Sequence, residues 1–410
     1  AKNSSMSTWR MARCGDDSGT DLLLIARYGH HRHYIGMLSQ FPILENDAPY
    51  LNHAAVGPWP RCTAEAVKAF ADENMRQGSN GYLNWVRREQ ELRRDLAELT
   101  GAPSATDIAL LKNTTECISA VAWGLDWNPG DSIVLPAREF PSNRLPWLAQ
   151  EKRGVEVREV DIRRTEDAEG ALLAAMDAST RLLTVSSVQW ADGLRLDLER
   201  LGGECKRRGV LFFVDAIQQL GALPVDVVAC HADFLAADAH KWLLAPEGIA
   251  VFYSHPEARD RLQLLQRGWN MVDKPWIFDR EEWEPSATAR RFEAGSPNST
   301  GQAALHASVR LLLEFGMDTV SRRILENTDF LLRNLVDIGG IHVTSRTAAE
   351  RRSGIVSFQH TTTAPDAIYQ ALRDQGISCA VREGSVRISP HFYQGENELE
   401  KLLLALVRIV

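Results

Sequence analysis

The sequence predicts an α/β fold with a mainly parallel central sheet, followed by a smaller α+β domain. Three observations support this prediction. From residue 107 short apolar runs alternate with amphipathic segments, after about residue 300 a long helical run replaces the alternation, and short strand-like runs return near the carboxyl terminus. Alternating strands and helices are typical of a parallel sheet, whose functional groups gather at the carboxyl ends of the strands.

The elements of the central sheet follow from their own runs of residues. Apolar runs predict strands at 108–112, 132–135, 155–160, 181–186, 210–214, 234–236 and 249–253. Amphipathic segments between them predict helices at 116–125, 144–150 and 198–208. Parallel strands need such crossovers, so the helices and the sheet support one another.

The last part of the chain predicts a second, smaller layer. The run GQAALHASVRLLLEFGMDTVSRRILENTDFLLRNLVD is helical with a break near Gly316, and IHVTS, GIVSFQ, GISCAV and SVRIS predict strands. The charged and aromatic stretch 265–292 predicts a long loop that either covers a pocket or packs in a dimer. The domains expected are a poorly ordered or non-native extension at 1–36, a segment joining the small domain at 37–60, a large domain at 61–300 and the small domain at 301–410.

Composition and charge exclude several classes of function. The net charge of −8 leaves no basic surface, so nucleic acid is not an expected partner. Apolar runs such as 22–25 and 402–406 are far shorter than the roughly 20 residues of a membrane helix. The six cysteines show no CxxC pair and no metal-like spacing, which predicts reduced thiols in a cytoplasmic protein and no metal site.

Polar or aromatic residues follow several predicted strands, and each has a structural alternative. Asp215 in VLFFVDAIQQLG ends an apolar strand, where it could equally cap the next helix. Lys241 in ADAHKW lies between two apolar runs, where a lysine could also extend its ammonium to solvent. Thr114 and Thr115 in LLKNTTECISAVAWGL begin a helix that could bind phosphate, or one of them could simply cap it. Phe140 in AREFPSNRLPW follows a strand, where phenylalanine is usually a core residue.

Taken together, these residues supply what pyridoxal phosphate (PLP) needs: an amine, a carboxylate for the ring nitrogen, an aromatic face and a phosphate cradle. The nucleotide signatures GxGxxG and GxxxxGK[ST] do not occur. The stretches YLNHAAVGPWP, KNTTE, EFPSNRLPW, VDAIQQLGALPVDV, DAHKWLLAPEGIAVFY, RFEAGSPNSTGQAAL and VRISPHFY resemble the class V aminotransferase family of PLP enzymes. That family includes cysteine desulfurases, kynureninase and isopenicillin N epimerase. The resemblance covers about residues 48–410 and implies the aspartate aminotransferase-like fold of PLP-dependent transferases.

The resemblance implies a set of cofactor contacts. Lys241 would form the Schiff base and move the proton at the substrate α-carbon, which requires a pKa lowered by burial and nearby positive charge. Asp215 would bind the pyridine nitrogen, and Gln218 in the D-x-x-Q arrangement would donate to the phenolic oxygen of the ring. Phe140 would stack on the ring. The phosphate would be held by Thr114, Thr115 and His240.

The resemblance also implies substrate contacts and a partner. Arg387 in VRIS would bind the substrate carboxylate in two-pronged fashion, which a guanidinium does better than an ammonium. Gln189 in SSVQW and His53 in YLNHAAVGPWP would face the substrate. Ser296 in EAGSPNS would reach the phosphate of a neighbouring subunit, which implies a homodimer with shared active sites. Two structural alternatives stay open, because Ser296 could only terminate a loop and Gln189 could only close a turn.

Two departures from the family pattern bear on the reaction. Desulfurases of this group carry a nucleophilic cysteine on a loop before the carboxylate-binding arginine, and GISCAVREGSVRIS leaves no room for such a loop. Cys379 is therefore expected to be structural, and desulfuration through a protein persulfide is disfavoured. Asp238 replaces the Ser or Asn that often precedes the His-Lys pair, and an anion there is expected to point away from phosphate, toward His240.

The reaction predicted is transamination of an amino acid through Lys241. The alternative on the same scaffold is a lyase or epimerase, such as a C–S lyase or an isopenicillin N epimerase-like enzyme. The sequence does not separate these, because the outcome depends on which substrate bond lies perpendicular to the ring. A non-catalytic PLP-binding module is the alternative from another class, and the joint presence of Lys241, Asp215 and Arg387 argues against it.

Overall fold

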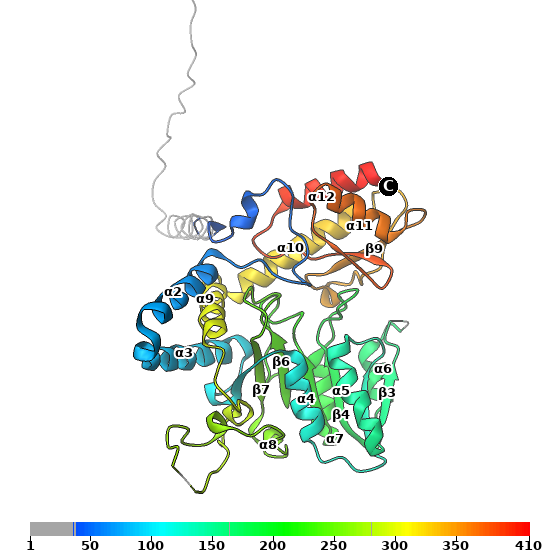
Figure 1. The fold of residues 1–410 in the computed structure, drawn as a ribbon. Coiled ribbons are helices and arrows are strands. Elements are labelled where there is room, and N and C mark those ends of the chain that lie inside the picture. Colours follow the sequence, from blue (N-terminus) through cyan, green and yellow to red (C-terminus); the bar gives the residue numbers. More distant parts are fainter. Residues whose placement is uncertain (1–35, 37, 164, 280) are drawn as a thin grey trace, which may run out of the picture. The chain divides into compact units, whose positions relative to one another are not determined.

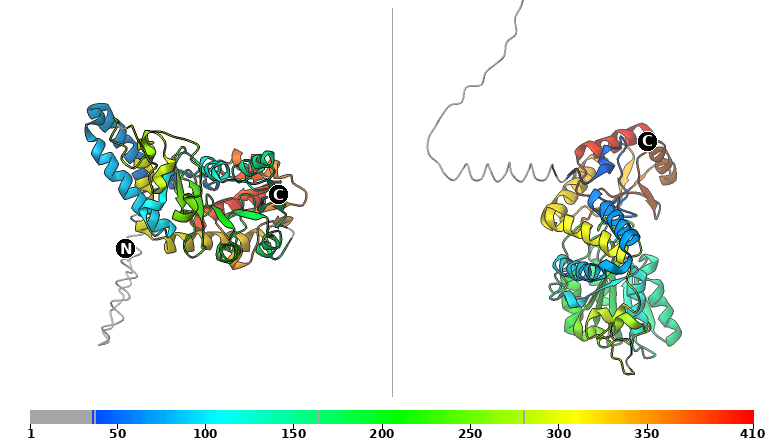
Figure 2. Two further views of the ribbon diagram at one scale, coloured as in Figure 1. Left: turned by 90° about the horizontal axis from the view of Figure 1, so that it is seen from below. Right: turned by 60° about the vertical axis from the view of Figure 1, so that its left-hand side comes forward.

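The computed structural model describes residues 36, 38–163, 165–279 and 281–410, and the prediction for residues 1–36 falls almost wholly outside them. Phe41–Val410 forms one compact unit, which is described here. It contains a seven-stranded sheet and a four-stranded sheet, each with its own apolar core (Figures 1 and 2). Among the described residues, no helix combines the length and the hydropathy that a membrane span requires.

The seven-stranded sheet confirms the predicted central sheet. Its order is β1-β7-β6-β5-β4-β2-β3, and only β7 runs antiparallel to its neighbours. β2, β5, β6 and β7 are buried at every position, which explains their continuous apolar runs. The strands are β1 (Ile108–Leu111), β2 (Ser132–Pro136), β3 (Glu156–Val160), β4 (Thr180–Ser186), β5 (Leu211–Asp215), β6 (Phe234–Asp238) and β7 (Ala250–Ser254).

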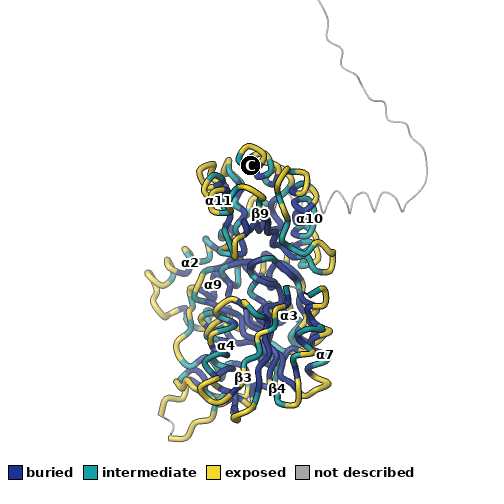
Figure 3. The backbone as a smooth tube through the Cα atoms, turned by 90° about the vertical axis from the view of Figure 1, so that its right-hand side faces the viewer, coloured by how far each residue is buried: buried dark blue, intermediate teal, exposed yellow. Residues whose placement is uncertain are grey.

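Helices cover this sheet on both faces (Figure 1). The crossover helices are α4 (Thr114–Gly124), α5 (Leu145–Leu148), α6 (Ala168–Ala174) and α7 (Leu198–Arg208), and α8 (Pro256–Arg259) follows β7. α2 (Arg61–Gln77) and α3 (Tyr82–Thr100) pack against α9 (Ser299–Phe315), far from them in sequence. In Figure 3 the strands between these layers are mostly dark blue, the colour of buried residues, and Tyr253, Phe212, Phe213, Phe234 and Phe252 of the sheet are fully buried.

The four-stranded sheet is antiparallel, in the order β10-β11-β9-β8. Its strands are β8 (Ile341–Val343), β9 (Val356–His360), β10 (Ala380–Arg382) and β11 (Ser385–Ile388), and its helices are α10 (Met317–Leu335), α11 (Pro365–Asp374) and α12 (Glu396–Ile409). The predicted helix break is confirmed, because Gly316 has φ 78° and separates α9 from α10. The segment before α2 joins this sheet through bridges from Tyr50 to Ser378 and from Asn52 to Ser389. The domain boundaries at 60 and 300 stay a prediction.

Candidate active site

Lys241 and Asp215 lie together at the carboxyl edge of the seven-stranded sheet. Asp215 is the last residue of β5, and Lys241 follows β6, the next strand in the sheet. Burial lowers the pKa of the Lys241 ammonium to about 8; the Asp215 carboxylate opposes this shift and Arg387 adds to it. Burial raises the pKa of Asp215 to about 7. The Ile217 amide donates to its Oδ1 at 3.1 Å and partly opposes this rise. The structural alternatives for these two residues do not hold. Lys241 is only 8% exposed, so it does not extend its ammonium to solvent. No helix follows Asp215, so this residue is not a helix cap.

An aromatic face lies beside the amine. The Nζ of Lys241 is 5.6 Å from the centroid of the Phe140 ring. Phe140 is 40% exposed, so it is not the core residue of the structural alternative, and Trp190 contacts its ring edge-on at 5.6 Å. The exposed ring therefore offers a stacking surface above the sheet edge, next to the only lysine that is buried among the described residues.

The amino end of α4 supplies the polar groups of the predicted phosphate cradle. Asn113 caps this helix by accepting from the Glu116 amide at 2.8 Å, so neither threonine is the cap. Thr114 accepts from the backbone of Asp238 at 3.0 Å, which ties α4 to the end of β6. The first turn of α4 therefore keeps N–H groups and the positive end of the helix dipole for an anion.

The remaining cradle residues adjoin this helix end. Thr115 is exposed and donates to the Ser142 hydroxyl at 2.8 Å, beside Phe140. The expectation for Asp238 is confirmed, because its Oδ1 lies 3.1 Å from the Nδ1 of His240. The carboxylate thus faces the imidazole.

Arg387 is a buried cation without a carboxylate. It lies on β11, is 2% exposed, and its Nη1 donates to the Trp190 carbonyl at 2.6 Å. Its Nε is buried and has no hydrogen-bond partner in the described part of the chain. Burial lowers the pKa of Arg387, and the positive charge of Arg382 lowers it further. A buried guanidinium with an unsatisfied N–H group is a binding site for an external carboxylate.

Gln218 is held in one orientation by its neighbours. Its Oε1 accepts from the indole of Trp242 at 2.8 Å, and its Nε2 donates to the Ala54 carbonyl at 3.0 Å. An amide nitrogen carries two N–H groups, so one remains for the oxygen of a bound ring. The sequence analysis missed Trp242, whose place directly after Lys241 was its only signal.

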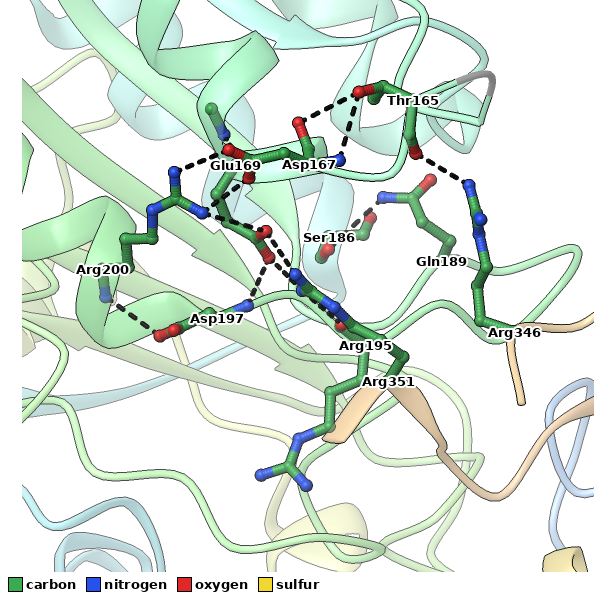
Figure 4. Close-up of polar contacts among 11 residues, drawn as sticks. Thr165, Asp167, Glu169, Ser186, Gln189, Arg195, Asp197, Arg200, Arg346 and Arg351 are labelled. Atoms are coloured by element: carbon green, nitrogen blue, oxygen red, sulfur yellow. Dashed lines mark hydrogen bonds and ion pairs between the residues drawn. The ribbon is translucent and has the colours of Figure 1, made fainter. Parts of the chain in front are cut away.

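Gln189 belongs to a hydrogen-bonded group that the sequence did not reveal. Its Nε2 lies 3.2 Å from Glu139 and 3.4 Å from the carbonyl of Ser186, the residue beside it in Figure 4. Glu139 also accepts from the amide and the hydroxyl of Ser186 at 2.6 and 2.5 Å. Its negative charge contributes to the raised pKa of Asp215. The sequence could have indicated Glu139 only through its position directly before the predicted stacking residue Phe140.

His53 lies beneath the site, packed against other rings. Its Nδ1 is 2.9 Å from the Ser389 carbonyl, and its Nε2 contacts the Tyr393 hydroxyl. The ring is fully buried, and burial lowers the pKa of His53 to about 4. Both ring nitrogens are engaged within the protein, so these contacts give no support to the prediction that His53 binds substrate.

The structure places Ser296 at the surface. It is exposed on the loop before α9 and lines a cavity of about 470 Å³ together with Lys112 and Gly248. Lys241 is not among the residues that line this cavity. A role at the site of a second subunit stays a prediction.

The described cysteines are poor nucleophiles. Cys379 is 5% exposed in the core of the four-stranded sheet, and burial raises its pKa to about 12. The other described cysteines, which are Cys62, Cys117, Cys205 and Cys230, also have a raised pKa, first because of burial. Reactive cysteines need exposed, electropositive surroundings, so none of these thiols is suited to accept sulfur.

Contacts between segments 163–197 and 345–352 hold the four-stranded sheet over the site (Figure 4). Arg351 donates to both oxygens of the fully buried Glu169 at 2.5 and 2.8 Å. Arg346 donates to the carbonyls of Arg163 and Thr165 at 2.9 and 2.8 Å. Two arginines of the segment between β8 and β9 thus bind the loop after β3 and the helix α6, which ties the four-stranded sheet to the large sheet's layer.

The residues at this edge fit pyridoxal phosphate. They bring together a buried amine, a buried carboxylate, the exposed ring of Phe140 and the amino end of α4. The buried Nε of Arg387 has no hydrogen-bond partner among the described residues. These groups come from five separate segments. Four of them end or follow strands of the seven-stranded sheet, and the fifth, Arg387, lies on β11 of the four-stranded sheet.

Comparisons with known proteins agree on one family. The family model described as aminotransferase class-V matches residues 49–402. A probable cysteine desulfurase of Methanothermobacter thermautotrophicus is 31% identical over 383 residues, covering 88% of this chain and 94% of that protein. A probable cysteine desulfurase of Pyrococcus abyssi is 29% identical and covers 90% of this chain and 95% of its own length.

Solved structures share the fold. A complex of the cystine C–S lyase C-DES with its reaction product cysteine persulfide has a TM-score of 0.83 and 27% identity, covering 90% of this chain and 100% of that one. A C-DES mutant with glycine covalently linked to its PLP cofactor has a TM-score of 0.84 and 26% identity, with 90% and 99% covered. An apo cysteine desulfurase of Thermococcus onnurineus NA1 has a TM-score of 0.80 and 26% identity, with 90% and 96% covered.

Proposed function

The chain belongs to the class V aminotransferases, a family of PLP-dependent enzymes, and from this premise we propose that it is a C–S lyase that cleaves the Cβ–S bond of a cysteine-derived amino acid. The relatives and structural neighbours favour this alternative over the transamination that the sequence predicted, because their names specify sulfur chemistry. The observation that carries the proposal is that no described thiol is suited to accept sulfur from the substrate. Cys379, the cysteine in the segment where desulfurases carry their nucleophile, is buried in a core. Sulfur then has to leave with the product.

The residues at the sheet edge fit such an elimination. PLP supplies an electron sink for the bonds that break at the substrate. Arg387 binds the α-carboxylate and so sets which substituent faces Lys241. The Lys241 amine, whose pKa burial lowers to about 8, takes the α-proton. The Cβ–S electron pair leaves with sulfur, and one water hydrolyses the three-carbon fragment to pyruvate and ammonium, so no oxidant or reductant is needed.

A product assay without a keto acid tests the reaction. The holoenzyme is incubated with L-cystine, and pyruvate and sulfane sulfur are measured by mass spectrometry in parallel with and without 2-oxoglutarate. We expect pyruvate at the same rate in both samples, because elimination regenerates the enzyme without an amino acceptor. Turnover that stops after one equivalent unless 2-oxoglutarate is present would show transamination instead.

We also propose a cytoplasmic homodimer with shared active sites. The support is the exposed position of Ser296 on a cavity wall that does not include Lys241, together with the reduced thiols of the described cysteines. Light scattering of the holoenzyme is expected to give twice the chain mass of 45.7 kDa. A fully active holoenzyme with the mass of a single chain would contradict the shared active site.

A further inference from the structure

A buried carboxylate joins the two loops that carry Phe140 and Trp190. Glu139 is 3% exposed and directly precedes Phe140 in the loop after β2. It accepts hydrogen bonds from the amide and the hydroxyl of Ser186, the last residue of β4, at 2.6 and 2.5 Å. It also accepts from the side-chain amide of Gln189, in the loop after β4, at 3.2 Å. One side chain therefore connects the loop after β2 with the loop after β4.

Two further contacts join the same loops. The Trp190 indole donates to the Arg138 carbonyl at 3.0 Å, and the Phe140 and Trp190 rings meet edge-on at 5.6 Å. Arg138 has φ 64°, a left-handed conformation that residues other than glycine seldom adopt and that persists only where neighbouring contacts hold it. The Trp190 bond to its carbonyl and the bonds of the next side chain, Glu139, supply such contacts. The two loops are thus held together as one unit.

The loop after β4 also determines where Arg387 lies. The Trp190 carbonyl accepts from the Nη1 of Arg387 at 2.6 Å, and it is the one hydrogen-bond acceptor that this guanidinium has among the described residues. Gln189 directly precedes Trp190, so the bond from Gln189 to Glu139 fixes the chain one residue before that carbonyl. A shift of the loop after β4 would therefore be transmitted to Arg387.

The charge of Glu139 has no opposite charge beside it. No ion pair between described residues involves Glu139, its hydrogen-bond donors are neutral, and burial raises its pKa. In the described chain, Asp215 at the same sheet edge is the other such case, and the remaining buried carboxylates, which pair with an arginine or a histidine, are Asp107, Glu169, Asp238 and Glu293. A buried charge without a counter-charge destabilises a fold, so stability alone does not account for a glutamate at this position.

We propose that Glu139 is a positioning residue that holds the loop after β4 in place for substrate binding. Through its bonds to this loop it fixes the Trp190 carbonyl, which in turn orients Arg387 for the substrate carboxylate. The inference rests on the proposed function, in which Arg387 binds that carboxylate, and it adds a residue that acts through others. An ionised carboxylate only accepts hydrogen bonds, so its two oxygens serve the Ser186 and Gln189 donors together. A glutamine side chain in its place has a single acceptor oxygen, and its own N–H groups would face one of these donors.

Glycine and glycinamide test this role in the holoenzyme. Glycine has no Cβ and cannot undergo the elimination, and glycinamide lacks its negative charge. Dissociation constants come from the change in cofactor absorbance at one pH, so the difference between the two amines cancels when variants are compared. We expect wild-type protein to prefer glycine by about 10–100-fold. E139Q should lower that preference about tenfold and change glycinamide binding by less than about twofold, and an unchanged preference would overturn the proposal.

Two further variants separate positioning from a structural role. E139Q/Q189E exchanges the partners, so the amide at position 139 donates to the carboxylate at 189 while its oxygen still accepts from Ser186. We expect the preference for glycine to return to within about threefold of wild type. D107N removes a carboxylate that is 4% exposed and pairs with Arg259, and it is expected to lower Tm without changing the preference. A lower Tm with an unchanged preference in E139Q, or no recovery in the exchange variant, would contradict the positioning role.

These binding measurements do not depend on the reaction proposed above. If L-cystine yields no pyruvate, the lyase assignment fails, but a preference for glycine that E139Q loses still supports the positioning role. If R387K reduces the preference and E139Q does not, Arg387 keeps its proposed function and the inference about Glu139 fails alone. Equal binding of glycine and glycinamide by the wild-type protein would remove Arg387 as the carboxylate site, and the role of Glu139 with it.

Discussion

Replacing Lys241 with alanine is expected to abolish covalent attachment of PLP and to lower kcat by about 10²–10⁴-fold. The amine is 8% exposed, faces the Phe140 ring at 5.6 Å and lies beside Asp215, so no other described lysine can take its place. Attachment is measured by borohydride reduction and peptide mass spectrometry, and turnover by pyruvate release. K206A is the control, because Lys206 is exposed on α7. A K241A protein that keeps both the visible cofactor band and turnover would remove Lys241 from the reaction.

The same amine gives the attachment a defined pH dependence. Only a neutral amine attacks an aldehyde, and burial lowers the pKa of Lys241 to about 8. The attachment rate of the apoprotein should therefore rise about tenfold per pH unit below pH 8 and level off above it. A rise that continues to pH 10 would mean that the amine keeps the pKa of an exposed lysine.

Continuous apolar runs made the central sheet predictable from sequence. β5 and β6 are buried on both faces, so their side chains are apolar at nearly every position, and the polar residue that ends each run marks the carboxyl edge. Lys241 and Asp215 were found in this way. Gly316 was found for a similar reason, since a positive φ favours a residue without a side chain.

Other features depend on packing that a sequence does not display. No helices were predicted between residues 61 and 100, because α2 buries only Thr63 and Phe70 and its charged residues leave a narrow apolar stripe. The contacts of Trp242 with Gln218 and of Glu139 with Ser186 join residues that are 24 and 47 positions apart. Asp192 and Arg382 meet at one cavity only because two sheets face each other. Such pairs have no local pattern in the sequence.

Replacing Arg387 with lysine is expected to raise KM for carboxylate substrates by about 10–100-fold, from loss of a charge-assisted contact of about 1.5–3 kcal/mol. The guanidinium is held by the Trp190 carbonyl and keeps a buried Nε without a partner, so an incoming carboxylate would satisfy a group that the protein leaves unsatisfied. An ammonium has neither the planar fork nor the reach to bind in two places.

Substrate carboxamides provide the matched comparison for this variant. The carboxamide of the methanethiol disulfide of cysteine lacks the negative charge, so wild-type protein should bind it more weakly than the acid, and R387K should distinguish the two less. The variant therefore lowers the preference for acid over amide while the rate for the amide stays nearly constant. An unchanged preference in R387K would place the α-carboxylate elsewhere.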